Sequence, residues 1–166
     1  MNRFRTLVFV GALLGMSTES VAADSYTHGS ACQPDKATAA AACVEYTNYG
    51  VHNACPATTA TVECPLTSVD YPVGGLVASV FIGMYDRNSS SNIQCFVQQT
   101  DGAGDVAYSI PLNSTTGGPG TGIQNRVNNN VNQSLAYFWR AKCTIPPAQS
   151  GQFSHVVGFY LNGTGD

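Results

Sequence analysis

Residues 135–143 read Leu-Ala-Tyr-Phe-Trp-Arg-Ala-Lys-Cys, and this stretch decides the fold. Every second position, from Leu135 through Trp139 to Cys143, is apolar, whereas Arg140 and Lys142 take alternate positions. Side chains two residues apart point to the same face of a β-strand. The stretch is therefore predicted to be a strand with one buried face, which places Trp139 and Cys143 in the core.

The segment 93–98, Ile-Gln-Cys-Phe-Val-Gln, shows the same alternation, with Ile93, Cys95 and Val97 on its apolar face. Because Cys95 and Cys143 are both expected to point into the core, we predict a disulfide bond between them. This bond would close a loop of nearly fifty residues. In the chain-entropy description, such a loop is worth roughly 4 kcal/mol of stability.

Short runs of β-branched and aromatic residues, separated by Gly, Asn, Ser and Asp, continue this pattern along the chain. The predicted strands are 43–48, 60–66, 76–86, 92–100, 105–112, 122–128, 134–144 and 153–161. They predict an all-β domain, an antiparallel two-sheet sandwich of the jelly-roll or immunoglobulin-like type. The strand at 76–86 is apolar on both faces and is expected in the middle of its sheet. Residues 35–43, beginning with Asp35, are the one candidate for a helix.

Six cysteines, an even number, predict a disulfide-stabilised protein of an oxidising compartment. Four of them lie in a cystine-rich N-terminal portion, residues 32–64. We favour a Cys32–Cys64 bond that encloses a Cys43–Cys55 bond, because a hairpin turning near residues 49–50 would bring these positions opposite each other. Other pairings of these four stay open. Zinc is the competing explanation, but the tight ligand pairs of structural zinc sites are absent.

The first 23 residues have the basic start, apolar stretch and small-residue end of a secretory signal peptide. Residues 24–166 would then form a single domain, secreted to the extracellular space or to the periplasm of a Gram-negative bacterium. The apolar stretch is too short to cross a bilayer, so no membrane anchor is expected after cleavage. Only 10% of the residues are charged and the net charge is −3, which argues against nucleic acid as a partner.

Several short motifs are spread along the sequence: Cys32-Gln33-Pro34, Tyr85-Asp86-Arg87-Asn88-Ser89, Cys95, Cys143-Thr144-Ile145-Pro146-Pro147, Gly151 and Ser154. Together they resemble a recurring type of small secreted bacterial protein, a group with no assigned activity. The resemblance implies a bacterial source, export and a disulfide-linked β fold. The resemblance assigns no functional residue to this chain. Cys43 and Cys55 look like an extra pair added locally to the shared pattern.

Catalysis needs a nucleophile, a base and an orienting group within reach of each other, and no motif supplies them. His28 is expected in a mobile start of the mature chain, and His52 on the surface of the cystine-rich hairpin. His155 is expected in a structural role on a strand, where it alternates with Val157, Phe159 and Leu161. We therefore predict no catalytic residue, no cofactor and no metal site. Asp101 and Asp105 are candidate calcium ligands, although two carboxylates fall short of the six to eight oxygens that calcium takes.

The remaining functions are assembly and binding at the cell exterior. Few charges and an Asn-rich segment at 124–133 slightly favour a structural or surface subunit that self-associates. The alternative is a carbohydrate- or protein-binding module with an extracellular glycan or protein as its partner, and a small secreted hydrolase is a more distant alternative. The aromatic residues expected to stack on a ligand are Phe138, Tyr26, Tyr49 and Tyr71, whereas Trp139 is assigned to the core.

Overall fold

In a computed structural model, antiparallel strands account for most of the residues that the structure describes, which are 24–66, 76–101, 103–129, 131, 133–134 and 138–164. The predicted leader, Tyr71, Leu135 and Tyr137 lie outside these residues. The first sheet contains β1 (Asp24–His28), β3 (Val44–Thr47), β4 (Gly50–Asn53), β6 (Leu76–Tyr85), β9 (Ile123–Asn128), β10 (Gln133–Ser134) and β12 (His155–Thr164). The second contains β2 (Gln33–Pro34), β5 (Ala60–Leu66), β7 (Gln94–Thr100), β8 (Val106–Asn113) and β11 (Phe138–Ile145).

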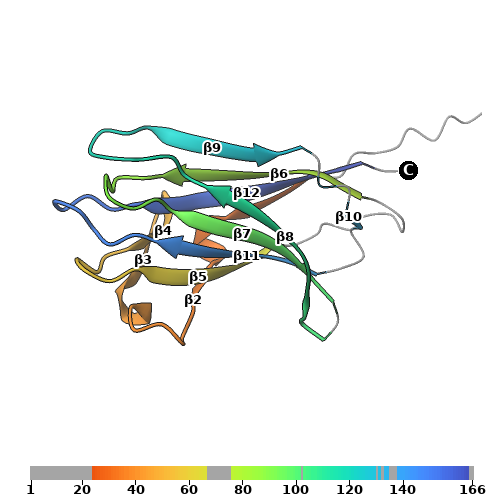
Figure 1. Ribbon diagram of the computed structural model, residues 1–166, viewed down its shortest axis with the longest axis horizontal. Coiled ribbons are helices and arrows are strands. Elements are labelled where there is room, and N and C mark those ends of the chain that lie inside the picture. The colour runs from red at the N-terminus through yellow and green to blue at the C-terminus, as the bar shows by residue number, and fades with distance from the viewer. Residues whose placement is uncertain are drawn as a thin grey trace, which may run out of the picture.

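The two sheets pack over each other as a sandwich (Figure 1). In the first sheet, β9 and β10 pair with one edge of β6, and β12 pairs with its other edge. Strand β12 also pairs with β1 and with β4, and β4 pairs in turn with β3. The second sheet has the order β2-β5-β11-β7-β8. The predicted sandwich is confirmed, and β6 holds the central position expected from its two apolar faces. Seven of the eight predicted strands have an observed counterpart, whereas residues of the predicted strand 134–144 are divided between β10 of the first sheet and β11 of the second.

The core lies between the sheets and is built from the apolar faces predicted for β7 and β11. Trp139 is only 4% exposed, and Cys143, Cys95, Ile93 and Val97 are fully buried. Cys95 is directly opposite Cys143 in the β7–β11 register. The alternation of apolar residues therefore identified the inner face of both strands correctly.

The three disulfide bonds join Cys32 to Cys64, Cys43 to Cys55 and Cys95 to Cys143, which are the pairings favoured from the sequence. Within the described residues no cysteine is free. The first bond links the start of β2 to β5, and the second links the segments on either side of the β3–β4 hairpin.

Two local predictions are wrong. Residues 35–43 form separate turns and a short 3-10 helix, Ala41–Cys43, because Asp35 holds a turn through its bond from the Ala37 N–H instead of starting an α-helix. His28 does not lie in a mobile segment, since it ends β1 and pairs with Gly158 of β12. A further short 3-10 helix, Gly29–Ala31, follows it. None of the helices among the described residues has the length and apolar character needed to cross a membrane.

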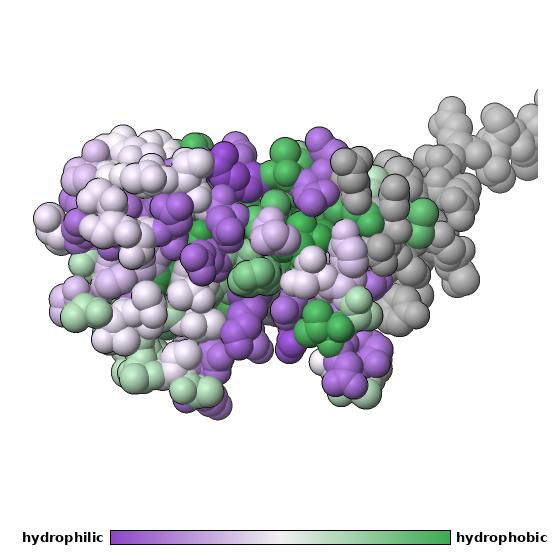
Figure 2. All heavy atoms as spheres, viewed as in Figure 1, coloured by the Kyte–Doolittle hydropathy of each residue, from purple (hydrophilic) through white to green (hydrophobic). Residues whose placement is uncertain are grey.

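The loops after β4, β6, β8 and β11 gather at one end of the sandwich, on the left in Figure 1. Figure 2 shows that this end is mostly white to pale purple, the colours of residues of intermediate hydropathy. This matches the low charge of the chain, because Ser, Thr and Gly provide much of the polar surface there.

Candidate functional site

A row of titratable and aromatic side chains crosses the outer face of the first sheet near its loop end. Register pairs Glu45 of β3 with His52 of β4, His52 with His155 of β12, and His155 with Tyr85 of β6. Directly opposite residues on antiparallel strands bring their side chains together. The histidine rings are accordingly 4.8 Å apart between their centroids.

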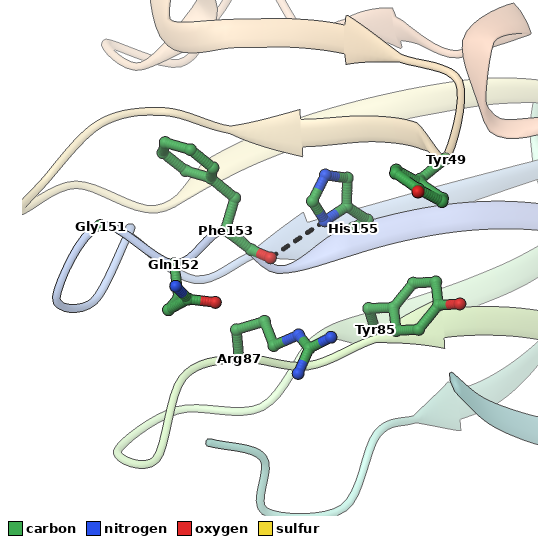
Figure 3. A pocket seen from close by; sticks show the side chains of 7 residues that line it. All are labelled: Tyr49, Tyr85, Arg87, Gly151, Gln152, Phe153 and His155. Carbon is green, nitrogen blue, oxygen red and sulfur yellow. Dashed lines mark hydrogen bonds between the residues drawn. The ribbon is translucent and has the colours of Figure 1, made fainter. Parts of the chain in front are cut away.

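A pocket of about 340 Å³ opens beside this row (Figure 3). Three segments that are distant in sequence build it: the β3–β4 turn, the end of β6 with the start of the loop that follows, and the loop that leads into β12 with the first residue of that strand. Its lining residues are Tyr49, Tyr85, Arg87, Gly151, Gln152, Phe153 and His155. The pocket is therefore a product of the tertiary fold and not of one continuous motif.

Tyr49 reaches the pocket because the following residue is glycine. Gly50 has φ of +115°, a conformation that favours glycine, and a side chain on it would run into the Val156 carbonyl of β12. The tight turn leaves Tyr49 63% exposed, with its ring centroid 6.2 Å from that of Tyr85 and 6.3 Å from that of His155. The two tyrosine rings meet edge to face, a favoured aromatic arrangement.

Arg87 supplies the positive charge of the pocket. Its guanidinium carbon lies 5.5 Å from the centre of the Tyr85 ring, in the range of a cation–π contact. No carboxylate among the described residues forms an ion pair with it. Its hydrogen-bond donors therefore remain available on the pocket side, and its side chain extends toward Tyr85 (Figure 3).

The buried carboxylate of Asp86 fixes the backbone between Tyr85 and Arg87. Asp86 is 0% exposed, and it accepts hydrogen bonds from the hydroxyl groups of Ser114 and Ser154 and from the Asn88 backbone N–H. The Ser154 hydroxyl also accepts a bond from the Arg87 N–H. This cluster, which we call the Asp86 clamp, joins three loops beneath the pocket. Because the Asp86 side chain points inward, its neighbours Tyr85 and Arg87 point outward.

His155 is held by a 3.0 Å hydrogen bond between its Nδ1 and the Phe153 carbonyl. A carbonyl only accepts, so Nδ1 carries the proton and Nε2 of the neutral ring is left as an acceptor. Burial lowers the pKa of His155 below its usual value, and the neighbouring His52 lowers this pKa further. The ring is therefore neutral at pH 7.

His52 lies behind His155 and is only 3% exposed, so the prediction that it is a surface residue is wrong. It is buried because the Phe153 ring packs 4.7 Å from its own ring centroid. Its Nε2 is 3.4 Å from Glu45 Oε2, yet neither ring nitrogen has a hydrogen-bond partner among the described residues. Burial lowers the pKa of His52, and this effect outweighs the opposing influence of Glu45.

The alternation assumed for the last strand is also wrong. His155 was expected to share a face with Val157, Phe159 and Leu161, but an irregularity in the pairing between Val156 and Gly158 shifts the pattern. Phe159 and Leu161 point into the core, whereas His155 and Val157 are half-buried on the outer face. A β-bulge of this kind turns one part of a strand relative to the other.

The four aromatic residues predicted to contact a ligand do not form one cluster. Tyr49 lines the pocket, and Tyr26, 59% exposed, lines a separate groove on the same face of the first sheet. Phe138 is 71% exposed but lies on the second sheet, at the far end of β11 from the loop that carries Phe153. Tyr71 lies outside the described residues.

Asp101 and Asp105, the candidate calcium ligands, lie in the turn between β7 and β8. Asp101 Oδ1 accepts bonds from the backbone N–H groups of Ala103 and Asp105, each 2.9 Å long. This carboxylate oxygen is therefore already engaged by backbone N–H groups of the turn. Within the described ranges, no group of three potential metal-ligating side chains comes together.

Residues 124–128 of the Asn-rich segment lie in β9, at the edge of the first sheet. Side chains connect this edge to the end of β8 and the residues after it: Arg126 Nε donates to the Asn113 carbonyl, and Gln124 Oε1 accepts from the Thr115 N–H. The edge is thus partly covered by contacts within the chain, one of the ways in which natural sheets protect an edge.

Sequence reasoning missed most of the pocket, namely Tyr85, Arg87, Gln152 and Phe153. The available signal was the motif Tyr85-Asp86-Arg87-Asn88, in which strand-like alternation sends the first and third side chains to one face. The fold brings this motif together with Gly151 and Ser154 at the pocket.

No protein-family model matches the chain, and no curated protein matches it. Among solved structures, it is similar to the enzymatically active domain of tailspike protein 4 from bacteriophage CBA120, with a TM-score of 0.40, 12% identity, and coverage of 84% of this chain and 18% of that one. TmCBM61 in complex with β-1,4-galactotriose gives a TM-score of 0.38 and 12% identity, over 84% of this chain and 86% of that chain.

Dimeric latent PorU from Porphyromonas gingivalis gives a TM-score of 0.40 and 12% identity, over 87% of this chain and 13% of that chain. The chain thus spans only a small part of the tailspike and PorU chains. None of these similarities identifies a ligand or an activity for this chain.

Proposed function

We propose that this protein is an exported, non-catalytic module that binds carbohydrate in the pocket formed by Tyr49, Tyr85 and Arg87. The observation that carries the proposal is the composition of this pocket: exposed aromatic rings stand beside free hydrogen-bonding groups in an open hollow. The aromatic and polar groups come from three separate segments, and the Asp86 clamp holds one of them in place.

The chemistry of a sugar matches this composition. A sugar ring has apolar C–H faces, which pack on aromatic rings, and hydroxyl groups at its rim, which need donors and acceptors. Tyr49 and Tyr85 offer the rings, Arg87 offers several donors, and Gln152 offers a donor and an acceptor. His155 adds an acceptor at Nε2, because its Nδ1 is already bonded to Phe153.

Binding without catalysis accords with the same lining. Glycoside hydrolysis ordinarily needs a pair of carboxyl groups that flank the bond, and acyl transfer needs a hydroxyl or thiol nucleophile next to a base. The described residues that line this pocket include no Asp, Glu, Ser, Thr or Cys. Glu45 touches the buried His52, on the side of β4 away from β12.

Export suits the three disulfide bonds, because such bonds form and persist in oxidising compartments outside the cytosol. A structural subunit, slightly favoured from sequence, remains the second candidate. Its support is the edge position of β9, where Val127 is 45% exposed. The contacts from Arg126 and Gln124 across that edge leave less of it open for another chain.

A glycan array followed by calorimetric titration of the glycans retained tests the proposal. We expect the oxidised protein to retain a defined set of glycans, and Tyr49→Ala and Arg87→Ala each to lose about five- to thirtyfold in affinity, because each removes a contact worth about 1–2 kcal/mol. Phe138→Ala is the matched control, since Phe138, like Tyr49, is a largely exposed aromatic residue but lies on the other sheet.

The control variant should bind as the wild type does. An array that retains no glycan would refute carbohydrate binding. Loss of binding in Phe138→Ala with none in Tyr49→Ala would refute the location of the site.

A further inference from the structure

A second hollow, which we call the glycine groove, lies on the same outer face of the first sheet and has a volume of about 530 Å³. The Gly83–Gly158 register pair lies on its floor, where β6 and β12 present no side chain. Its walls come from Tyr26, Phe81, Tyr160, Ile123 and Val157, with the Asn125 side chain at one edge. None of the described lining residues carries a formal charge.

The glycine groove continues the pocket along the strands. Gly83 lies two residues before Tyr85 on β6, and Val157 lies two residues after His155 on β12. Ile123 of β9, a wall of the groove, is directly opposite Tyr85 in the register. Residues two apart share a face, so the floor of the groove and the wall of the pocket belong to one surface.

The combined surface is longer than one sugar ring. From Tyr85 to Phe81 the strand advances four residues, about 13 Å at roughly 3.3 Å per residue. Aromatic rings stand at both ends: Tyr49 and Tyr85 at one, and Tyr26 with the Phe81–Tyr160 pair, whose centroids are 5.7 Å apart, at the other. Two aromatic platforms separated by an uncharged floor suit a neutral, linear ligand.

Tyr26 is held in its place by the missing side chain beneath it. A Cβ on Gly158 would lie 2.6 Å from the Tyr26 hydroxyl, so only glycine lets this ring cover the end of the groove. Gly83 is different, because a Cβ there would make ordinary contacts of 3.5–3.6 Å with Asn125, Ile123 and Val157. A larger side chain at position 83 would therefore fill the groove without a clash at its Cβ.

We infer that the glycine groove is a second subsite, and that the ligand is a neutral linear oligosaccharide extending from the Tyr49–Tyr85 pocket toward Tyr26 and Phe81. The inference rests on the proposed function and adds a length and charge requirement to it. The groove contacts only those sugar units of the ligand that extend beyond the unit held in the pocket. The groove therefore leaves the affinity for short ligands unchanged and raises the affinity for long ones.

Calorimetric titration with β-1,4-linked gluco-, galacto- and manno-oligosaccharides of one to six units tests this subsite. We expect affinity for the preferred series to rise about tenfold once the chain outgrows the pocket, as an additional aromatic contact would provide. Gly83→Val and, independently, Tyr26→Ala should remove this gain and leave the affinity for the shortest bound member unchanged. Tyr49→Ala should weaken every member of the series.

The outcomes separate the two proposals. Affinity that does not change with length, or a length gain that survives both Gly83→Val and Tyr26→Ala, overturns the second subsite and leaves the pocket intact. If no member binds, the subsite and the proposed function both fail. If Gly83→Val and Tyr26→Ala instead change the mass measured by light scattering, the groove is a contact between two copies and the inference is wrong. Thermal unfolding of each variant reports whether it is folded.

Discussion

The Asp86 clamp gives the most specific prediction about stability. We expect Asp86→Asn to lower the free energy of unfolding by about 2 kcal/mol. The amide keeps one oxygen, which can accept from the Asn88 N–H and the Ser154 hydroxyl as Asp86 Oδ1 does at 3.1 Å to each. The amide nitrogen then faces the Ser114 hydroxyl, which must turn from donating a bond to accepting one.

The magnitude follows from the change of the three shortest charge-assisted bonds into neutral ones, with the longer 3.4 Å bond from the Ile93 N–H left aside. Bonds to charged groups contribute about 1.5–3 kcal/mol and neutral ones about 0.5–1.5 kcal/mol, a difference of roughly 1 kcal/mol for each bond. Part of this loss of about 3 kcal/mol is recovered because a buried amide is less costly to desolvate than a buried carboxylate. The remainder is about 2 kcal/mol.

Urea unfolding followed by tryptophan fluorescence measures this loss through Trp139, the one tryptophan of the chain. With a slope of about 2 kcal/mol per molar, the midpoint should fall by about 1 M. Asp101→Asn is the control, because Asp101 is partly exposed and water weakens the charge contribution to its two bonds, which the amide oxygen can keep. A midpoint unchanged in Asp86→Asn, or lowered equally in Asp101→Asn, would refute the role assigned to the clamp.

Three further predictions concern the disulfide, the turn and the histidines. The double variant Cys95→Ala/Cys143→Ala should lose about 4 kcal/mol in urea unfolding, since the bond spans 48 residues, and a loss below about 1 kcal/mol would contradict this estimate. Gly50→Ala should lower the melting temperature by several degrees at least, because its Cβ meets the Val156 carbonyl; an unchanged melting temperature would contradict the turn geometry. Because the pKa values of His52 and His155 are lowered in the fold, the unfolded chain binds more protons below about pH 6.5. The free energy of unfolding should therefore fall from pH 7.5 to 5, and this fall should shrink in His155→Gln; stability that rises on acidification would contradict the burial of these rings.

The core could be predicted from the sequence because period-two alternation is a local property. Cys95, Val97, Trp139 and Cys143 lie on the inner faces of their strands as predicted, and the register places the two cysteines opposite each other. To predict the Cys95–Cys143 pairing, it was enough to know which face of each strand is buried, and the alternation of apolar residues shows this.

The pocket could not be predicted in the same way. It requires the register of β3, β4, β12 and β6, which brings Glu45, His52, His155 and Tyr85 into one row, and sequence alternation does not carry this information. The irregularity between Val156 and Gly158 places His155 and Val157, at the start of β12, on the outer face instead of the face that holds Phe159 and Leu161. Irregularities of this kind depend on tertiary packing and leave no period in the sequence.

Chemical-shift mapping by NMR tests the central claim most directly. The isotope-labelled, oxidised protein would be titrated with the glycan retained most strongly on the array. The account predicts the largest amide shifts at Tyr49, Tyr85, Arg87, Gln152 and His155, with shifts spreading to Gly83 and Gly158 only for longer chains. Shifts confined to the second sheet around Phe138, or no shift at saturating glycan, would contradict carbohydrate binding at this site.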